Sequence, residues 1–283
     1  EILDDTTGHL SDSSLPLLAR RCAPVQAHYI GYVGTIGVPA VDYYIGDDEL
    51  TPAEFQPHFT EKIIRLPRLW MALDTPKFAP APAAPVENHV TFGSFNILAK
   101  AGPATLDIWG QCLARVPEAR LILKYQDGAD GVLQARVLAG LAAHGIAPDR
   151  VTFIDWVPDW QAHMALYNRI DIALDTVPLN SGTTGFDALF MATPLVAMRG
   201  PRTPSRISAD MLKALGRPEW IAETSDQYVD IVSALAADLG RLRAFKTTLR
   251  SDVLASPLCN GANLARELEE AFGIMAAEAG LRC

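Results

Sequence analysis

Between residues 90 and 215, short apolar runs alternate with segments of helical periodicity, and this alternation limits the possible folds more than any other feature of the chain. The expected strands are 90–95, 120–124, 151–154, 172–175 and 194–198, and the expected helices are 103–116, 132–144, 160–169, 184–191 and 208–215. Strands separated by helices pair in parallel through right-handed crossovers. Continuous apolar strands indicate a sheet that is covered on both faces. We therefore expect a doubly wound, Rossmann-like α/β domain from about Asn88 to about Trp220.

A run of alternating Pro and Ala at 78–85 divides the chain, because such a run continues neither a helix nor a central strand. We expect residues 1–79 to be the end of a first α/β domain, 80–88 to be a linker, and 89–283 to be the second domain with a helical tail. In the first part we expect strands at 25–32 and 41–45, a glycine-punctuated loop at 31–39, and a surface turn at Asp47-Asp48. The chain opens without an initiator Met, so we expect it to be a piece of a longer protein.

Charge and cysteine content exclude several classes of function. The net charge is -9 and no Lys/Arg cluster occurs, which argues against nucleic acid as a partner. The acidic balance argues against docking on anionic membranes, and no apolar run has the length of a membrane span. No basic segment precedes an apolar run at the start, as a signal peptide would require. The four cysteines show no zinc spacing, so we expect unpaired thiols in a cytoplasmic protein.

Ligands of doubly wound sheets bind outside the carboxyl ends of the strands, so residues that follow each strand are the first candidates. The first group is Gly93-Ser94-Phe95-Asn96, followed by Lys100 just before a helix. A lysine there is placed to meet a phosphate group; the alternative is an ordinary surface lysine. The segment is not the G-x-G-x-x-G pattern, so a dinucleotide cofactor is disfavoured.

The second group is the segment 175–187, which follows the fourth strand and opens a helix. Its Gly182-Thr183-Thr184 turn lets the backbone approach a ligand, and either threonine is suited to cap the helix. The N–H groups at the start of the helix suit a diphosphate. Asp187, one turn further, is expected either to reach ribose hydroxyls or to strengthen the helix start. The alternative for the whole segment is a plain capped turn.

The third group follows the third strand, where Val157 and Pro158 are placed to frame a base and His163 to contact a phosphate. The alternative for His163 is a packing residue. No second metal ligand stands at the required spacing, and no D-x-D pair follows a strand, so we expect no metal. The charge that builds on a departing diphosphate would then be stabilised by a lysine, helix N–H groups and hydroxyls.

Together these segments resemble the catalytic region of O-linked N-acetylglucosamine transferases of glycosyltransferase family 41, particularly their bacterial members. The matching segments, in order, are Ala23-Pro24-Val25-Gln26, Gly31-Tyr32-x-Gly34-Thr35-x-Gly37, Asp42-Tyr43, Glu61-Lys62, Leu66-Pro67, Gly93-Ser94-Phe95-Asn96 with Lys100, His163-Met164-Ala165-Leu166-Tyr167, Asp171-Ile172-Ala173-Leu174-Asp175-Thr176, Gly182-Thr183-Thr184, Ser205-Arg206 and Ser256-Pro257-Leu258-Cys259. They extend over almost the whole chain.

The resemblance implies a GT-B fold with a complete C-terminal Rossmann-like domain and the end of the N-terminal domain. It implies inverting, metal-independent transfer of N-acetylglucosamine from UDP-GlcNAc, as donor substrate and not as cofactor, to Ser or Thr of acceptor proteins. It also implies tetratricopeptide repeats in the parent protein. The alternatives are a GT-B enzyme with a non-protein acceptor and a non-catalytic nucleotide-sugar-binding module.

The resemblance also implies roles for individual residues. The catalytic candidates are Lys100 and His9, whose Gly8-His9-Leu10 partly matches the family's Gly-His-Thr. The donor-binding candidates are Asn96, Lys100, Val157, Pro158, His163, Gly182, Thr183, Thr184 and Asp187. The departures from the family pattern are Val33 for the usual Pro, Ile97 for a Gln, and Gly182 for the His of animal members.

Overall fold

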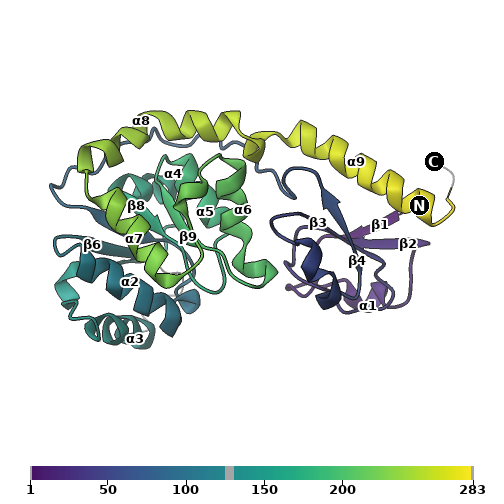
Figure 1. Ribbon diagram of the computed structural model, residues 1–283, viewed down its shortest axis with the longest axis horizontal. Coiled ribbons are helices and arrows are strands. Elements are labelled where there is room, and N and C mark those ends of the chain that lie inside the picture. Colours follow the sequence, from purple (N-terminus) through teal and green to yellow (C-terminus); the bar gives the residue numbers. More distant parts are fainter. Residues whose placement is uncertain (1, 125–130, 282–283) are drawn as a thin grey trace. The chain divides into compact units, whose positions relative to one another are not determined.

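The computed structural model describes residues 2–124 and 131–281 and divides the chain into two compact units. The first unit comprises residues 1–74 and 256–283, and the second comprises residues 75–255. Both units are labelled by element in Figure 1. Every helix in the described part is too short or too polar to span a lipid bilayer.

The second unit is the doubly wound domain that the sequence predicts. Its strands, all paired in parallel in the order β10-β9-β8-β5-β6-β7, are β5 (Thr91–Ser94), β6 (Arg120–Lys124), β7 (Val151–Ile154), β8 (Ile172–Leu174), β9 (Leu195–Met198) and β10 (Ile221–Ala222). Its α-helices are α2 (Pro103–Arg115), α3 (Gly131–Ala142), α4 (Trp160–Ala165), α5 (Thr183–Phe190), α6 (Ile207–Ala214), α7 (Ser225–Ala236) and α8 (Leu239–Ala255). The five predicted strands and five predicted helices of this domain are confirmed, with small differences at their ends.

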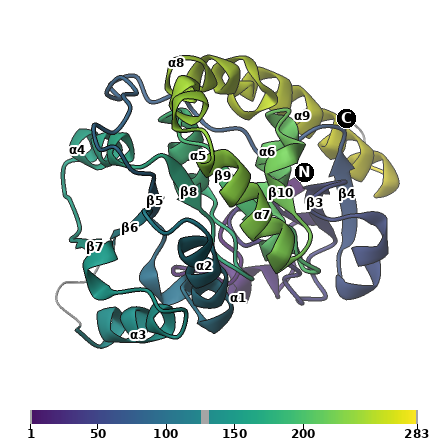
Figure 2. The same cartoon turned by 60° about the vertical axis from the view of Figure 1, so that its left-hand side comes forward.

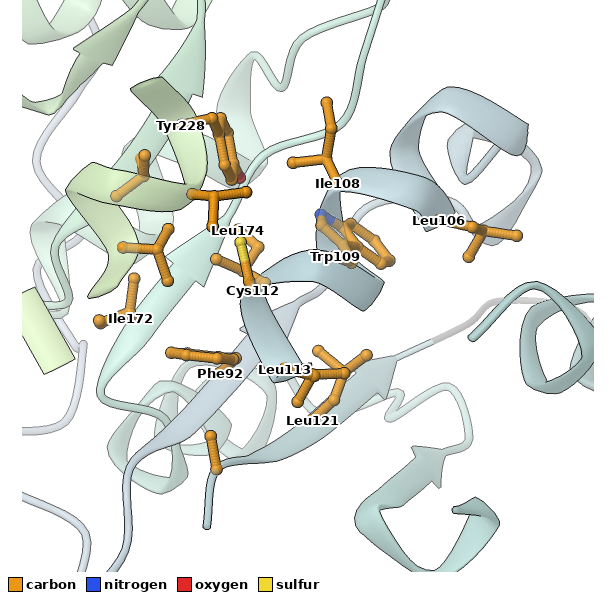
Figure 3. Packing of buried hydrophobic residues seen from close by; sticks show 14 of the residues in the cluster. Phe92, Leu106, Ile108, Trp109, Cys112, Leu113, Leu121, Ile172, Leu174 and Tyr228 are labelled. Atoms are coloured by element: carbon orange, nitrogen blue, oxygen red, sulfur yellow. The ribbon is translucent and has the colours of Figure 1, made fainter. Parts of the chain in front are cut away.

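Helices cover both faces of this sheet, with α2, α3 and α7 on one face and α5, α6 and α8 on the other (Figure 2). Trp109 and Cys112 of α2 pack against Phe92 of β5, Leu174 of β8 and Tyr228 of α7 (Figure 3). All five side chains are buried. This burial on both faces explains why the strands are continuous apolar runs without alternation.

The first unit is a smaller α/β layer with a parallel sheet in the order β1-β2-β3-β4. Its elements are β1 (Ile2–Asp5), α1 (Leu15–Leu18), β2 (Val25–His28), β3 (Tyr43–Asp47), β4 (Lys62–Leu66) and α9 (Gly261–Glu278). The strand predicted at 25–32 is confirmed only for its first half, because β2 ends at His28, and the strand predicted at 41–45 is shifted by two residues. The loop predicted at 31–39 is confirmed. The sequence did not reveal β1, which ends in two aspartates, or β4, which carries charges at both faces.

Two expectations about the domain division need correction. The sequence predicts that the helical tail belongs to the second domain, but residues 256–283 group with the first unit. The cause is a set of polar contacts: Arg68 pairs with Glu267 at 3.0 Å, and Tyr43 Oη donates to Glu278 at 2.8 Å. The second correction concerns the Pro/Ala linker, which groups with the second unit. Asn168 holds it there, since its Nδ2 donates to Ala81 O at 3.0 Å and its Oδ1 accepts the N–H of Ala83 at 2.9 Å.

Asp47 does not lie in a surface turn as expected, although a turn follows it. Its side chain is 1% exposed, at the end of β3. The carboxylate accepts backbone N–H groups of Glu49, Leu50 and Trp70 at 2.7–2.9 Å. Cys22, Cys112 and Cys259 are unpaired thiols as expected, and Cys283 lies outside the described residues.

Candidate functional site

Lys100 meets the turn that opens α5, although 80 residues separate them. Lys100 ends a short 3-10 helix (Leu98–Lys100) after β5, and its Nζ donates to the backbone oxygen of Asn180 at 3.1 Å. A second hydrogen bond goes to Asn96 Oδ1 at 3.3 Å. Because an ammonium group has three N–H donors, one remains for a ligand. The lysine and the Gly-Thr-Thr turn therefore belong to one site.

The turn that Lys100 contacts is held in place by Asp175, which follows β8 and is 1% exposed. Its Oδ1 accepts the N–H groups of Thr176 and Ser181, both at 2.9 Å. Asn180 is fixed as well, since its N–H donates to Pro204 O at 3.0 Å and its Nδ2 to Thr176 O at 3.2 Å. The acceptor carbonyl for Lys100 is thus preorganised. Asp175 and Asn180 belong to the candidate segment 175–187, but the sequence alone does not distinguish them from their neighbours as functional residues.

The electrostatics of Lys100 favour an anionic ligand. Burial lowers the pKa of Lys100, and the nearby carboxylate of Asp175 opposes that shift. A partly desolvated ammonium has lost favourable interactions with water, and an anion that enters the site restores them. A diphosphate fits this requirement.

The start of α5 offers backbone donors at the same place. Gly182 is its N-cap with φ of -100° and ψ of -106°, and no side chain of the described residues caps the helix. The expectation that Thr183 or Thr184 caps α5 is therefore wrong, since the helix begins at Thr183 and places both hydroxyls inside the first turn. This correction strengthens the anion site, because the first N–H groups of an uncapped helix are left for a ligand.

His163 is not a satisfied packing residue. It lies on α4, with its ring beside those of Phe95 and Tyr167, at centroid distances of 6.3 and 5.8 Å. Burial lowers the pKa of His163 to about 4, and Lys124 adds to that effect. The imidazole is therefore neutral at physiological pH. Its buried Nδ1 has no hydrogen-bond partner among residues 2–124 and 131–281.

Asp187 lies opposite His163, with 4.0 Å between its Oδ2 and His163 Nε2. Burial raises the pKa of Asp187 to about 6, and Lys124 opposes the shift. Lys124, the last residue of β6, is a cation near both side chains that was not among the expected site residues. Its position at the end of a predicted strand was the available signal.

The loop between β7 and α4 supplies an aromatic surface. Val157 is half-buried and Pro158 is exposed, and Trp156 and Trp160 on either side are 52% and 41% exposed. Exposed indole rings suit stacking against a planar base. Trp156 was not among the expected site residues, but a tryptophan two residues after a strand was a readable signal.

The described residues thus bring the donor-binding candidates together on the carboxyl edge of the second sheet, whereas His9 lies in the first unit. His9 follows β1, is exposed, and contacts Ile36 O through Nε2 at 2.8 Å. Its ring packs edge-on against Tyr32 at 4.9 Å. In the part of the chain that the structure describes, no three His, Cys, Asp or Glu side chains gather as a metal site would require.

The raised pKa of Asp187 predicts a pH-dependent affinity for a nucleotide sugar. If ribose hydroxyls donate to this carboxylate, binding needs its ionised form, which is present above pH 6 and lost as the pH falls through about 6. The affinity for UDP-GlcNAc, the donor that the family resemblance implies, is then expected to be about tenfold lower at pH 5 than at pH 7.5, from the linkage of one proton. Calorimetry at the two pH values measures this, and this ligand has no phosphate monoester that titrates in the same range.

Asp187→Asn is the control for that measurement, because the amide does not titrate. Its affinity for UDP-GlcNAc is expected to be lower at pH 7.5 and to change little down to pH 5. An equal pH dependence in Asp187→Asn and the unaltered chain would exclude Asp187 as the titrating group.

Comparison with known proteins gives consistent similarities. The family described as Glycosyl transferase family 41 matches residues 2–80 and 83–268. A probable UDP-N-acetylglucosamine–peptide N-acetylglucosaminyltransferase SPINDLY of Petunia hybrida is 36% identical over 97% of this chain and 30% of its own length. A probable transferase of the same kind, SEC of Arabidopsis thaliana, is 27% identical over 96% of this chain and 29% of its own length. The chain therefore spans about 30% of the curated relatives it matches.

Solved structures agree with these relatives. A variant of the O-GlcNAc transferase of Thermobaculum terrenum superposes with a TM-score of 0.92 at 34% identity, over 99% of this chain and 53% of that one. A sucrose-phosphate synthase of Thermosynechococcus elongatus, at 14% identity and a TM-score of 0.63, shares the fold alone. The expected fold class, that of GT-B glycosyltransferases, is confirmed.

Proposed function

The chain belongs to glycosyltransferase family 41, and from this membership and the site around Lys100 we propose that it transfers N-acetylglucosamine from UDP-GlcNAc to Ser or Thr hydroxyls of proteins. The transfer inverts the sugar configuration and needs neither metal nor cofactor. The observation that carries the proposal is the 3.1 Å hydrogen bond between Lys100 Nζ and Asn180 O, which joins a cation to the uncapped start of α5.

In the proposed reaction, the acceptor hydroxyl oxygen forms a bond to the anomeric carbon while the bond from that carbon to the diphosphate breaks. The electron pair of the broken bond passes to the leaving UDP. Lys100 and the first N–H groups of α5, with the hydroxyls of Thr183 and Thr184, stabilise the charge that develops there. We assign His9 the role of general base, which accepts the proton of the acceptor hydroxyl.

The remaining candidates hold the nucleoside in this proposal. Asp187 accepts ribose hydroxyls, and neutral His163 donates to the nucleotide through the nitrogen that carries its proton. Val157 and Pro158 bind the base through backbone atoms, and Asn96 and Gly182 shape the diphosphate pocket. The tetratricopeptide repeats of the parent protein and its cytoplasmic location are parts of the same proposal.

The test is transfer itself, followed by mass spectrometry. The purified chain is incubated with Ser/Thr peptides in three parallel reactions, which contain UDP-GlcNAc, UDP-glucose or a GDP-sugar as the donor. We expect one N-acetylhexosamine on a peptide hydroxyl with UDP-GlcNAc and no product with the other donors. Preferred use of another donor would overturn the donor assignment.

Two results would favour the alternatives. Hydrolysis of UDP-GlcNAc without peptide modification points to a non-protein acceptor. UDP binding without any turnover points to a nucleotide-sugar-binding module.

A further inference from the structure

Glu61, just before β4, carries a buried carboxylate that fixes the glycine-punctuated loop of the first unit. Its side chain is 1% exposed. Oε1 accepts the backbone N–H groups of Ile36 and Gly37, both at 3.0 Å, and Oε2 accepts the hydroxyl of Thr35 at 2.8 Å. Gly37 has φ of +70°, a left-handed conformation that favours glycine. The carboxylate thus determines how the peptide groups on either side of Ile36 are oriented.

One of these peptide groups connects Glu61 to His9. In the peptide group between Ile36 and Gly37, the N–H of Gly37 donates a hydrogen bond to Glu61. The carbonyl oxygen of Ile36, in the same group, lies 2.8 Å from the ring nitrogen Nε2 of His9. A carbonyl oxygen only accepts, so Nε2 must carry a proton. A carboxylate that accepts the N–H of an amide also makes the oxygen of that amide a stronger acceptor.

We propose that Glu61 is a positioning residue for His9, acting through the Ile36–Gly37 peptide group as a carboxylate does when it bonds a catalytic histidine directly. The inference rests on the proposed function, since it assigns His9 the task of a general base. With its proton held on Nε2, neutral His9 presents the lone pair of Nδ1. That nitrogen has no hydrogen-bond partner among the residues described, and the side chain is exposed.

The hydrogen bonds from Glu61 through the Ile36–Gly37 peptide group to His9, called the relay below, also stabilise the protonated His9 that results from proton transfer. When Nδ1 takes a proton, the imidazolium charge lies one peptide group from the Glu61 carboxylate. The polarised amide keeps its oxygen toward Nε2–H in both protonation states, so the ring does not have to turn between them. The edge-on contact with Tyr32 restricts the same ring from the side.

The first measurement is the tautomer of His9 in the whole 283-residue chain. Imidazole nitrogen NMR of protein labelled with nitrogen-15 histidine distinguishes Nε2–H from Nδ1–H, and the His9 signals among the six histidines are those lost in His9→Asn. We expect the Nε2–H form in the unaltered chain. Finding the Nδ1–H form there would overturn the proposal without any variant.

Glu61→Gln is the decisive variant, because the amide retains an acceptor oxygen for the loop but loses the charge. We expect a mixture of His9 tautomers. We also expect the kcat for peptide glycosylation to fall about tenfold or more, a loss typical of removing a group that orients a functional side chain. The KM for UDP-GlcNAc is expected to stay unchanged. A His9 signal identical to that of the unaltered chain would refute the relay.

Asp47→Asn is the matched control. Asp47 is equally buried in the same unit and accepts three backbone N–H groups, but those belong to Glu49, Leu50 and Trp70. We expect it to lower stability and to leave the His9 signal unchanged. Equal changes of that signal in both variants would mean that general loosening, and not Glu61, is responsible.

The relay and the proposed function fail in different ways. If the unaltered chain does not bind UDP-GlcNAc, the proposed function fails, and the tautomer measurement still decides the role of Glu61. If UDP-GlcNAc binds and is turned over but Glu61→Gln behaves like the unaltered chain, only the relay fails.

Discussion

Lys100→Met is expected to weaken UDP-GlcNAc binding by about 1.5–3 kcal/mol, or roughly 10- to 150-fold, because it removes a charge-assisted hydrogen bond to the diphosphate. The loss in turnover is expected to be larger, about 10²- to 10³-fold, since the charge on the leaving group is greatest in the transition state. Methionine keeps an unbranched apolar side chain close to the lysine stem in size and removes the ammonium group with its hydrogen bonds to Asn96 and Asn180. Calorimetry gives the affinity and mass spectrometry gives the rate.

Lys77→Met is the control for that experiment. Lys77 is an exposed lysine in the same unit and has no part in the site, so both affinity and rate are expected to stay within experimental error. If Lys100→Met bound UDP-GlcNAc as tightly as Lys77→Met does, the ammonium of Lys100 would not contact the donor. The thermal unfolding of both variants establishes that the fold is intact.

Gly31→Ala is expected to destabilise the first unit by about 3 kcal/mol or more, at the upper end for an overpacked site. A Cβ at this position would lie 1.8 Å from the backbone oxygen of Thr6 and 2.7 Å from its carbonyl carbon. Backbone atoms do not rotate away as a side chain does. Gly31 is also held by its own hydrogen bond to Tyr29 O, and Tyr29 N is bonded to Asp5 O.

Gly34→Ala separates this clash from the general cost of altering the loop. The nearest atom to a Cβ there is a ring carbon of Tyr32 at 3.4 Å, an ordinary contact. Its effect on stability is expected to be within about 0.5 kcal/mol. Urea unfolding of the two variants measures the difference, and equal stabilities would show that residues 31 and 6 do not approach so closely.

Local sequence patterns were sufficient for five of the six strands of the second unit because most of these strands are buried and alternate with periodic helices. The five strands predicted there have three to five residues, are mostly apolar and are flanked by turn signals, and the five predicted helices repeat their apolar positions every three to four residues. The strands that escaped prediction lack this signal. β10 has two residues, β1 is half acidic, and β4 begins with Lys62 and contains Arg65.

The position of candidate residues along the chain was also readable, because in a parallel sheet every strand ends at the same edge. That rule places Lys100, His163 and the Gly182 turn on one edge from the sequence alone. The rule does not say which of the residues at that edge contact a ligand. Lys124 and Trp156 satisfy the same rule, but neither stands in a Gly- or Thr-rich run that would mark it as part of a site.

The sequence by itself therefore determined the parallel α/β architecture, the edge of the sheet that carries the site, and the types of side chain on it. Only the tertiary structure decided which of these groups touch. The bond from Lys100 to Asn180 and the link from Glu61 through Ile36–Gly37 to His9 join residues far apart in the chain. Periodicity reports which face of an element is buried, whereas a hydrogen bond depends on the packing of several elements at once, and no local pattern encodes that.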